Sequence, residues 1–464
     1  MSEAGDKQER VITSLGGMAI VAGSMLGIGI FLTPPQVAAH MGSVGGYLLV
    51  WLLGGVIAIS GAVAYAELGT RFPEAGGDYV FLREAFGAPL SFAAGWLLFF
   101  GVFTGSVATM AVPLAEFQLP VLLEPVMEID PHQPLVGWGW LELTVARAIG
   151  IGLIAVLTAI NILGTKLSTG MQIALTGAPV VLLGLGALGL LIWHPGVEDG
   201  SLMTSDGEGG TAVGMGRAIL AVYFAYAGWN AIAYVGGEMQ HPGSSIPRSL
   251  LGGTALITLL YLLLAGSFVY VLGMEGLEET MEAGTATAMA VAEGPGAYGV
   301  TALIAVALVG SLNGTILVGG RVGWAMAKKG SLSDGVGELS DRFGTPARAL
   351  ILQGGLALIL VMTGTFEMLL EMTSIAMFVM SGLTVWALFR IRKRDGAHAP
   401  YQAAGYPWLP LLFLAISVAV VLASIYRATT AGFDAMAESV FPLMGLALFL
   451  GLWMAREGWD RLRA

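Results

Sequence analysis

Two apolar stretches of the sequence hold residues that could free backbone groups for ligand binding. The first reads GSMLGIGIF over residues 23–31, with three glycines and a Pro-Pro pair shortly after it. Glycine lowers the cost of leaving a helix, and unpaired N–H and C=O groups persist at membrane depth only where they line a cavity or bind something. We therefore expect a helix break centred on Met25 and Leu26. The alternative is an unbroken helix that packs closely through Gly23-x-x-x-Gly27.

The second stretch reads AVYFAYAGWNAIAYVGGEM over residues 221–239, and aromatic and small residues alternate at its middle. Asn230 places a polar amide there, and Trp229 lies away from the membrane interface where tryptophan is usually found. We expect a second helix break in this segment. The alternative is a close helix crossing at Gly228 with ordinary aromatic packing around it.

The residue types that enzymatic or metal chemistry needs are missing or scattered. The chain has no cysteine, which excludes disulfides, thiolate metal sites and a cysteine nucleophile, and its five histidines are not paired at metal-ligand spacing. The apolar segments hold no His/Asp/Glu cluster, and we find no nucleotide-binding motif. The net charge of -11 offers no basic field for nucleic acid. These observations argue against an enzyme, an ATP-driven pump, a nucleic-acid binder and any metal or cofactor.

The composition indicates which elements must position the two interrupted stretches. Of the 464 residues, 56% are hydrophobic and 11% are charged, whereas soluble proteins carry about 25% charged residues. Nearly the whole chain consists of apolar runs long enough to cross a bilayer, so we predict an all-α integral membrane protein. The first run follows a polar tail and lacks a cleavage site, which favours a retained span over a signal peptide. The twelve predicted spans are 12–39, 43–68, 88–117, 143–163, 170–193, 214–237, 249–273, 297–324, 346–363, 366–389, 407–427 and 440–456.

The basic residues predict the orientation of these spans. With the N-terminus in the cytoplasm, 18 of the 21 Lys and Arg residues lie inside. Arg147, Arg217 and Arg427 are the three that would lie outside. Because cytoplasmic loops carry the excess of basic residues, we expect both termini on the cytoplasmic side of the cytoplasmic membrane.

The two interrupted spans are numbers one and six, so each would open a set of five. That layout is typical of an inverted repeat of five plus five helices, in which paired broken helices form the binding site. The predicted parts of the chain are a cytoplasmic tail at 1–11, a first repeat at 12–193, an extracytoplasmic loop at 194–213, a second repeat at 214–395, and helices 11 and 12 with the cytoplasmic C-terminus at 396–464.

Five motifs occur in the order and spacing of a known family. They are GSMLGIGIFLTPP from residue 23, YAELGTRFPEAGGDYVFLREAFG at 65–87, FAYAGWN from residue 224, EMQHPGSSIPRS at 238–249 and SLNGTILVGGRVGWAMAKKGSL at 311–332. Over residues 10–390 the chain resembles the amino acid–polyamine–organocation superfamily, and within it the L-type amino acid transporter branch and its bacterial relatives.

The resemblance implies a leucine-transporter-like fold of twelve transmembrane helices in a 5+5 inverted repeat, with helices 1 and 6 broken. It implies a secondary transporter, either an exchanger or a facilitator, that moves amino acids by alternating access from a site at mid-membrane. We favour neutral substrates because Ala225 and Ala227 leave room in the site. The alternative is a transporter of polyamines or other organic cations, which would need an acidic or cation–π site at mid-membrane. Tyr226 and Trp229 could supply the second kind of site, but we find no mid-span carboxylate for the first.

An amino acid needs hydrogen-bond donors for its carboxylate and acceptors for its ammonium group. Backbone N–H groups around Gly27, Ile28 and Gly29, where the outer half of span one begins, would supply the donors with help from the helix dipole. Freed carbonyls at the ends of half-helices in spans one and six would supply the acceptors. The predicted substrate-binding residues are Ser24, Met25, Leu26, Gly27, Ile28, Gly29, Phe224, Ala225, Ala227 and Gly228.

The resemblance also implies gating and supporting roles. Phe224 would act as the outer lid over the substrate, and Trp229 and Asn230 would support the unwound part of span six. Ser311 and Asn313 would face the back of span one, where sodium-coupled members of the wider fold hold a cation. For each residue ordinary packing is the alternative, and a serine in a helix can also bond to its own backbone.

The chain departs from the family's pattern at three points. Pro179 stands where many members carry a lysine in span five, which puts lysine-based proton coupling in doubt and predicts a kink in that span. Ile28 stands where a serine is common, so a hydroxyl contact to the substrate is lost while the backbone N–H remains. Animal L-type transporters are tethered to a glycoprotein through a cysteine that this chain lacks. We therefore expect no disulfide-linked ancillary subunit, and either a single chain or a non-covalent homo-oligomer.

Overall fold

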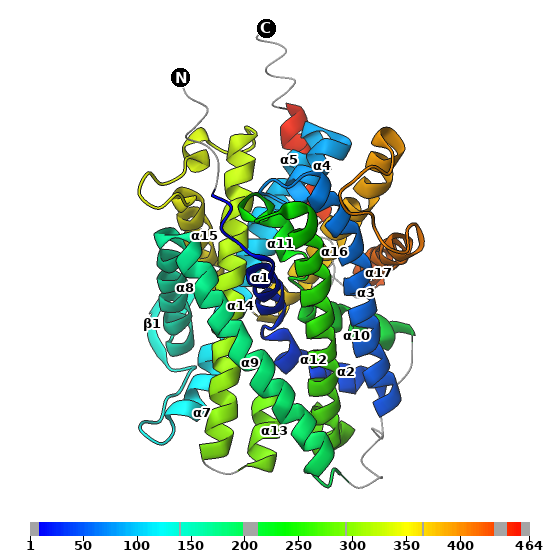
Figure 1. Cartoon of the computed structure of the whole chain (residues 1–464). Coiled ribbons are helices and arrows are strands. Elements are labelled where there is room, and N and C mark those ends of the chain that lie inside the picture. The colour runs from blue at the N-terminus through cyan, green and yellow to red at the C-terminus, as the bar shows by residue number, and fades with distance from the viewer. Residues whose placement is uncertain are drawn as a thin grey trace.

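The computed structural model describes residues 9–138, 141–197, 212–292, 295–363, 366–430 and 443–455. Helices make up most of this part of the chain (Figure 1). An antiparallel hairpin of β1 (Pro134–Trp138) and β2 (Leu141–Thr144) lies in the long polar segment that follows the third predicted span. The predicted tail at 1–11 and the predicted loop at 194–213 fall largely outside the described residues.

The helices follow one another along the chain with short connections. They are α1 (Ser14–Met25), α2 (Gly29–Met41), α3 (Val44–Arg71), α4 (Asp78–Phe86), α5 (Ala88–Trp96), α6 (Thr104–Ala111), α7 (Leu119–Leu123), α8 (Val145–Leu163), α9 (Thr165–Trp193), α10 (Ala212–Ala225), α11 (Ala231–Tyr234), α12 (Pro242–Glu278), α13 (Ala283–Val291), α14 (Pro295–Lys328), α15 (Ala347–Thr363), α16 (Phe366–Asp395) and α17 (Trp408–Thr430). Two π-helical segments, η2 (Leu97–Phe103) and η3 (Leu114–Gln118), and two 3-10 segments, η5 (Gly236–Glu238) and η6 (Asp334–Gly337), lie among them.

Within the described ranges, eight helices are long and apolar enough to cross a membrane, and the bent pair of α1 and α2 adds a ninth. Three shorter apolar helices cover Gly214–Ala225, Ala347–Thr363 and Leu443–Ala455. All of these helices overlap the apolar segments predicted from the sequence, so the all-helical membrane class is confirmed at this level.

The break predicted in the first span is present, one residue later than its predicted centre. The Thr13 side chain caps α1 by accepting a hydrogen bond from the Gly16 N–H. The helix ends at Met25, and α2 starts at Gly29 with an axis bent by 44°. The three residues between the two helices leave the regular helical hydrogen-bond ladder. Glycine on both sides of this turn is what makes the departure inexpensive.

The break predicted in the sixth span is also present, and it is longer. Here α10 ends at Ala225, and α11 begins only at Ala231. Gly228 has a φ of 97°, a left-handed conformation that residues with a side chain rarely adopt. The glycine is therefore required at this position by the backbone itself.

The third span is irregular in a different way. It runs over Ala88–Leu123 through α5, η2, α6, η3 and α7 in succession. Two π-helical stretches interrupt its α-helical geometry, and such stretches are frequent at functional sites. Side chains from η2 and α6 line the cavity described below.

The two broken helices pack inside a ring of longer ones. The inner contacts of α1 are with α9, α12 and α14, and those of α2 are with α10 and α12. Figure 1 shows α1 in the interior of the bundle, between α14 and α12. Trp51, Tyr226 and Tyr261 pack as a buried aromatic group, with ring centroids 5.9 Å apart for Trp51–Tyr261 and 5.0 Å apart for Tyr226–Tyr261. Each such pair adds about 0.5–1.5 kcal/mol beyond its area burial, which holds the second break against α3 and α12.

Candidate functional site

The two helix breaks lie directly against each other. A Cβ added to Gly228 would lie 2.6 Å from the backbone oxygen of Ser24. A Cβ added to Gly29 would lie 2.4 Å from the Cα of Ala225. Neither position has room for a side chain, so the two breaks pack against each other through their backbones.

The first break offers backbone donors at the start of α2. The N–H groups of Ile28 and Gly29 have no hydrogen-bond partner among the described residues. These N–H groups lie at the N-terminus of the 13-residue helix α2, where the helix dipole favours a negative charge. The N–H of Gly27 is different, because it donates to the carbonyl oxygen of Met25 at 2.7 Å. Two of the three predicted donors are thus open.

Most of the predicted carbonyl acceptors already have donors. The hydroxyl of Tyr261 donates to the carbonyl oxygens of both Met25 and Ala225, the latter at 3.0 Å. The oxygen of Phe224 accepts from the Ala227 N–H at 3.0 Å.

Two carbonyls are left for a ligand. The hydroxyl of Ser311 donates to the Ser24 oxygen at 3.3 Å, which occupies one more predicted acceptor. The carbonyls of Leu26 and Ala227 have no partner in the described part of the chain.

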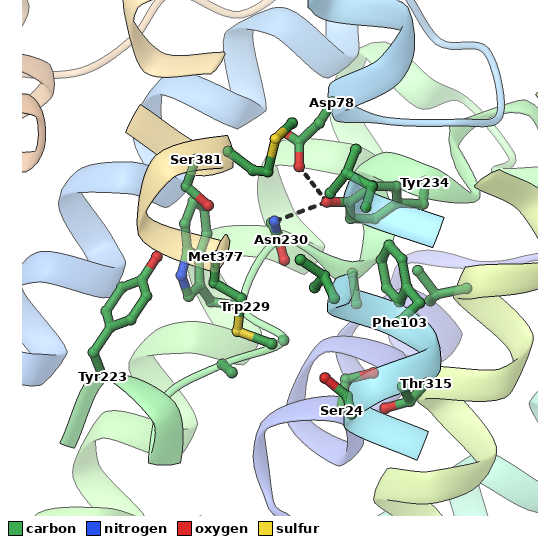
Figure 2. Close-up of a pocket in the computed structure, with 18 of the residues that line it drawn as sticks. Ser24, Asp78, Phe103, Tyr223, Trp229, Asn230, Tyr234, Thr315, Met377 and Ser381 are labelled. Atoms are coloured by element: carbon green, nitrogen blue, oxygen red, sulfur yellow. Dashed lines mark hydrogen bonds between the residues drawn. The ribbon is translucent and has the colours of Figure 1, made fainter. Parts of the chain in front are cut away.

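A cavity of about 50 Å³ lies beside the two breaks, which is room for about four water molecules. Figure 2 shows Ser24 and Thr315 at one end of it and Asp78 at the other. The side chains and backbone that line it are those of Ser24, Asp78, Leu98, Val102, Phe103, Ser106, Met110, Tyr223, Ala227, Gly228, Trp229, Asn230, Ala231, Tyr234, Thr315, Val318, Met377, Met380 and Ser381.

Five of the predicted site residues line this cavity, and the others lie behind its wall. The five are Ser24, Ala227, Gly228, Trp229 and Asn230. The predicted residues that are buried without lining it are Met25, Leu26, Gly27, Ile28, Gly29, Phe224, Ala225, Ser311 and Asn313.

Two hydroxyls in the lining have no partner. The oxygens Oγ of Ser24 and Ser106 are buried and make no hydrogen bond within the described structure. A buried polar group without a partner is costly, and a polar ligand in the cavity would satisfy both. Within the described ranges, no three His, Asp or Glu side chains gather to hold a metal ion.

Aromatic packing fixes the second break from the side away from the cavity. The Trp229 ring lies edge-on to Tyr65, with centroids 4.8 Å apart, and contacts Phe413 of α17 at 5.7 Å. The neighbouring Tyr223 stacks on Phe378 at 3.5 Å and lines the cavity where the predicted lid, Phe224, does not.

An uncharged polar network fills the space behind the first break. Asn313 donates to Gln172 at 2.7 Å and accepts from Asn161 at 2.9 Å. Gln172 lies against α1, since a Cβ added to Gly23 would come within 2.0 Å of its amide nitrogen. Close helix packing at Gly23 and a helix break therefore coexist, although they were expected as alternatives. Gln172 lies on α9, which continues as an α-helix through Pro179.

The far end of the cavity holds a buried carboxylate. Asp78 is 1% exposed and accepts a hydrogen bond from the hydroxyl of Tyr234. Asn230 donates to that same hydroxyl at 3.2 Å (Figure 2). Asp78 lies between two predicted spans and not within one, so the statement that no mid-span carboxylate supplies an acidic site did not cover it. Asp78 belongs to the motif at residues 65–87, but no local feature of the sequence indicates that this loop returns to the interior of the bundle.

The same end of the bundle is closed by side-chain and backbone contacts. Arg321 and Glu238 form a buried ion pair at 2.8 Å. The backbone of Ile12 pairs with the segment after α11, through bonds of 2.9 Å to Glu238 and 2.8 Å from Gln240. At the opposite end, α13 packs on α2, where a Cβ on Gly284 would meet Phe31 at 2.7 Å. Both ends of the bundle are therefore held by contacts between segments from distant parts of the sequence.

Comparisons with known proteins agree with this architecture. The profile of the amino acid permease family matches residues 13–450. The chain is 29% identical to the serine/threonine exchanger SteT of Bacillus subtilis over 443 residues, which cover 95% of each chain. It is 27% identical to the human b(0,+)-type amino acid transporter 1 over 455 residues, covering 96% of this chain and 88% of that one. It is 28% identical to the human cystine/glutamate transporter over 471 residues, covering 98% of this chain and 88% of that one.

Proposed function

The chain belongs to the amino acid permease family, and we propose that it carries amino acids across the cytoplasmic membrane by alternating access, as an exchanger or a facilitator. The observation that carries this proposal is the meeting of two broken helices at Ser24 and Gly228 beside a cavity that both residues line. Paired half-helices of this kind supply ligand-binding groups at mid-membrane without charged side chains.

The proposal includes the topology. Eight long helices, one bent pair and three shorter apolar helices support twelve transmembrane spans, with spans one to five and six to ten as inverted repeats. The distribution of basic residues supports cytoplasmic termini. In that orientation the Asp78 end of the cavity faces the cytoplasm.

Groups from both helix breaks would bind the zwitterion. The open N–H groups of Ile28 and Gly29 lie behind the cavity wall, as does Leu26, and they would hold the carboxylate once the two breaks separate during alternating access. The open carbonyls of Leu26 and Ala227 would accept from the ammonium group. The partnerless hydroxyl of Ser24 lines the cavity and adds a donor or an acceptor as the substrate requires.

The size and polarity of the cavity support small neutral amino acids as substrates. Its volume is about 50 Å³, and its free hydroxyls at Ser24 and Ser106 suit a substrate with a polar side chain. Serine and threonine are therefore the first substrates to test, and the similarity to a serine/threonine exchanger adds to that choice.

The test uses purified protein in liposomes. Labelled serine is added outside, with or without unlabelled serine inside. We expect uptake that saturates and that is accelerated by internal serine. A Gly29→Ala variant, whose methyl group would enter α10, should lose this uptake, whereas Gly266→Ala, with open space around it, should keep it. Equal uptake by both variants would contradict the site, and no uptake of any amino acid by the native protein would contradict the function.

Transport of organic cations is the second candidate function, because a buried carboxylate lines the cavity. One oxygen of Asp78 is already bonded by Tyr234, and the other is open. The same liposomes distinguish the two candidates when a labelled diamine replaces serine. Saturable diamine uptake without serine uptake would favour the second.

A further inference from the structure

Asp78 is not used by the binding scheme above, yet it sits at the cavity wall with an unsatisfied oxygen. Its carboxylate is almost fully buried, and Oδ1 has no hydrogen-bond partner in the described structure. The hydroxyls of Tyr65 and Thr384 face it, and both are buried without partners as well. Two hydroxyl donors therefore face the open carboxylate oxygen, so the polar groups around Asp78 are placed to respond to its charge.

Among the residues that the structure describes, no unpaired positive charge faces Asp78. The ionisable groups that face it are Tyr65 of α3, Tyr223 of α10 and Tyr234 of α11, together with the hydroxyls of Ser381 and Thr384 of α16.

Two arginines on the helices that pack against α4 have carboxylates of their own. Arg321 of α14 is paired with Glu238, and Arg392 of α16 is paired with Glu67. An ionised Asp78 is therefore stabilised by hydroxyl groups and by the N-terminus of α4, which begins at this residue.

This environment sets the affinity of Asp78 for a proton. Burial raises the pKa of Asp78 to about 6, while the hydrogen bond from Tyr234 and the hydroxyls of Tyr65 and Thr384 work against that rise. The carboxyl group is then ionised at pH 7 and protonated when the pH falls below about 6.

The charge of Asp78 can reach the substrate site through a short chain of hydrogen bonds. The Tyr234 hydroxyl donates to Asp78 and accepts from the Asn230 amide at 3.2 Å. Asn230 is the residue before α11 and lies two positions after Gly228. The backbone oxygen of Tyr234 also accepts from Gly76 at 2.9 Å, which ties α11 to the loop that carries Asp78.

We propose that Asp78 is a proton-binding site of the transport cycle, and that Tyr234 and Asn230 convey its charge to the unwound segment of span six. The step forms one O–H bond on the Asp78 carboxylate, and the proton comes from water that reaches the cavity. Tyr234 keeps its own proton but no longer faces a negative charge, so the hold of α11 on the α4 loop weakens. The inference rests on the proposed amino acid transport and adds protons to it.

The first experiment measures serine exchange in liposomes, with equal pH on both sides, between about pH 5 and about pH 8. The native protein should change its rate about tenfold across this range, since coupling equal to one pKa unit corresponds to that factor. Asp78→Asn should exchange serine at a rate that no longer depends on pH. Tyr234→Phe removes a donor to the ionised form, so its midpoint should move upward by about one pH unit. Glu74→Gln is the matched control, because this carboxylate is on the same loop but exposed, and it should behave like the native protein.

The second experiment does not depend on transport. Infrared difference spectra of the native protein should show a carboxylic acid band that titrates near pH 6 and is missing in Asp78→Asn. If that variant does not fold, an upward shift of the band in Tyr234→Phe decides the assignment in its place.

The outcomes separate the two proposals. A pH dependence that survives in Asp78→Asn, or a native band that does not titrate in this range, would overturn the proton site. So would an Asp78→Asn variant that loses only the binding of sodium or of a cationic amino acid. Absence of serine exchange in the native protein would instead overturn the proposed function, and the infrared titration would still decide whether Asp78 binds a proton.

Discussion

The centre of the bundle and its Asp78 end solve different problems with different chemistry. At the centre, the two breaks meet through glycines, and the groups available to a ligand belong to the backbone and to small hydroxyls. At the Asp78 end, closure relies on charged and phenolic side chains, including the buried Arg321–Glu238 pair. We therefore expect substitutions at the centre to act through the fit between the two backbones, and substitutions at the Asp78 end to act through charge and pH.

The largest effect is expected for Gly27→Leu at the centre. A Cβ at this position would already lie 2.6 Å from the Ser311 hydroxyl, so a leucine cannot fit between α1 and α14. We expect serine exchange to fall by about a hundredfold or more, because overpacking of this kind displaces backbone by amounts that ruin a binding geometry. Gly266→Leu is the control, with no atom near its Cβ. Normal serine exchange by Gly27→Leu, measured in liposomes, would contradict the expectation that substitutions at the centre act through the fit between helices.

The next effect is expected for Arg321→Met at the Asp78 end. Removing one partner of a buried ion pair costs about 3–5 kcal/mol, because the other charge is left unpaired. The midpoint of thermal unfolding in detergent should fall strongly. The double variant Arg321→Met/Glu238→Gln should recover most of that loss.

Arg348→Met supplies the contrast for this pair. Its partner Glu338 is exposed, as Arg348 is, and breaking such a pair costs about 1 kcal/mol or less. Equal losses for Arg321→Met and Arg348→Met would show that charge burial does not stabilise this end of the bundle.

A smaller effect is expected for Tyr261→Phe. The change leaves the carbonyl of Ala225 without a donor, while that of Met25 keeps the Gly27 N–H, and a buried unsatisfied group costs about 1–3 kcal/mol. Exchange should slow by about tenfold while the protein stays folded. Tyr270→Phe on the same helix removes a hydroxyl that bonds only to His194 in the described structure, and it should exchange normally.

The smallest effect on stability is expected for Ser24→Ala. The hydroxyl has no partner in the described structure, so its removal should leave the thermal midpoint of the unliganded protein unchanged or slightly raised. The apparent affinity for serine should fall by about threefold to tenfold, the worth of one hydrogen bond. Ser417→Ala, whose hydroxyl bonds within α17, is the control. An unchanged affinity for Ser24→Ala would place the substrate elsewhere.

Local features of the molecule could be predicted from the sequence. The breaks at Gly27 and Gly228 were predictable because glycine acts on its own stretch of backbone. The helical membrane class was predictable because hydropathy is summed along the chain. The donor at Gly27 was not predicted correctly, since its N–H closes a tight turn with Met25 that no residue pattern signals.

Contacts between distant residues could not be predicted in the same way. Tyr261 reaches Met25 across 236 residues of sequence, and Tyr234 reaches Asp78 across 156. Both depend on how helices pack, and a tyrosine or an aspartate alone does not indicate its partner. For this reason the sequence analysis predicted backbone groups at the two breaks and did not predict the side chains that pack against them.

The most direct test of the central claim is an experimental structure of the protein with a bound amino acid. We predict that the substrate carboxylate lies about 3 Å from the backbone nitrogens of Ile28 and Gly29. The ammonium group should lie toward the carbonyls of Leu26 and Ala227. A substrate bound in the same cavity but held through its carboxylate by side chains, or bound away from both breaks, would contradict it.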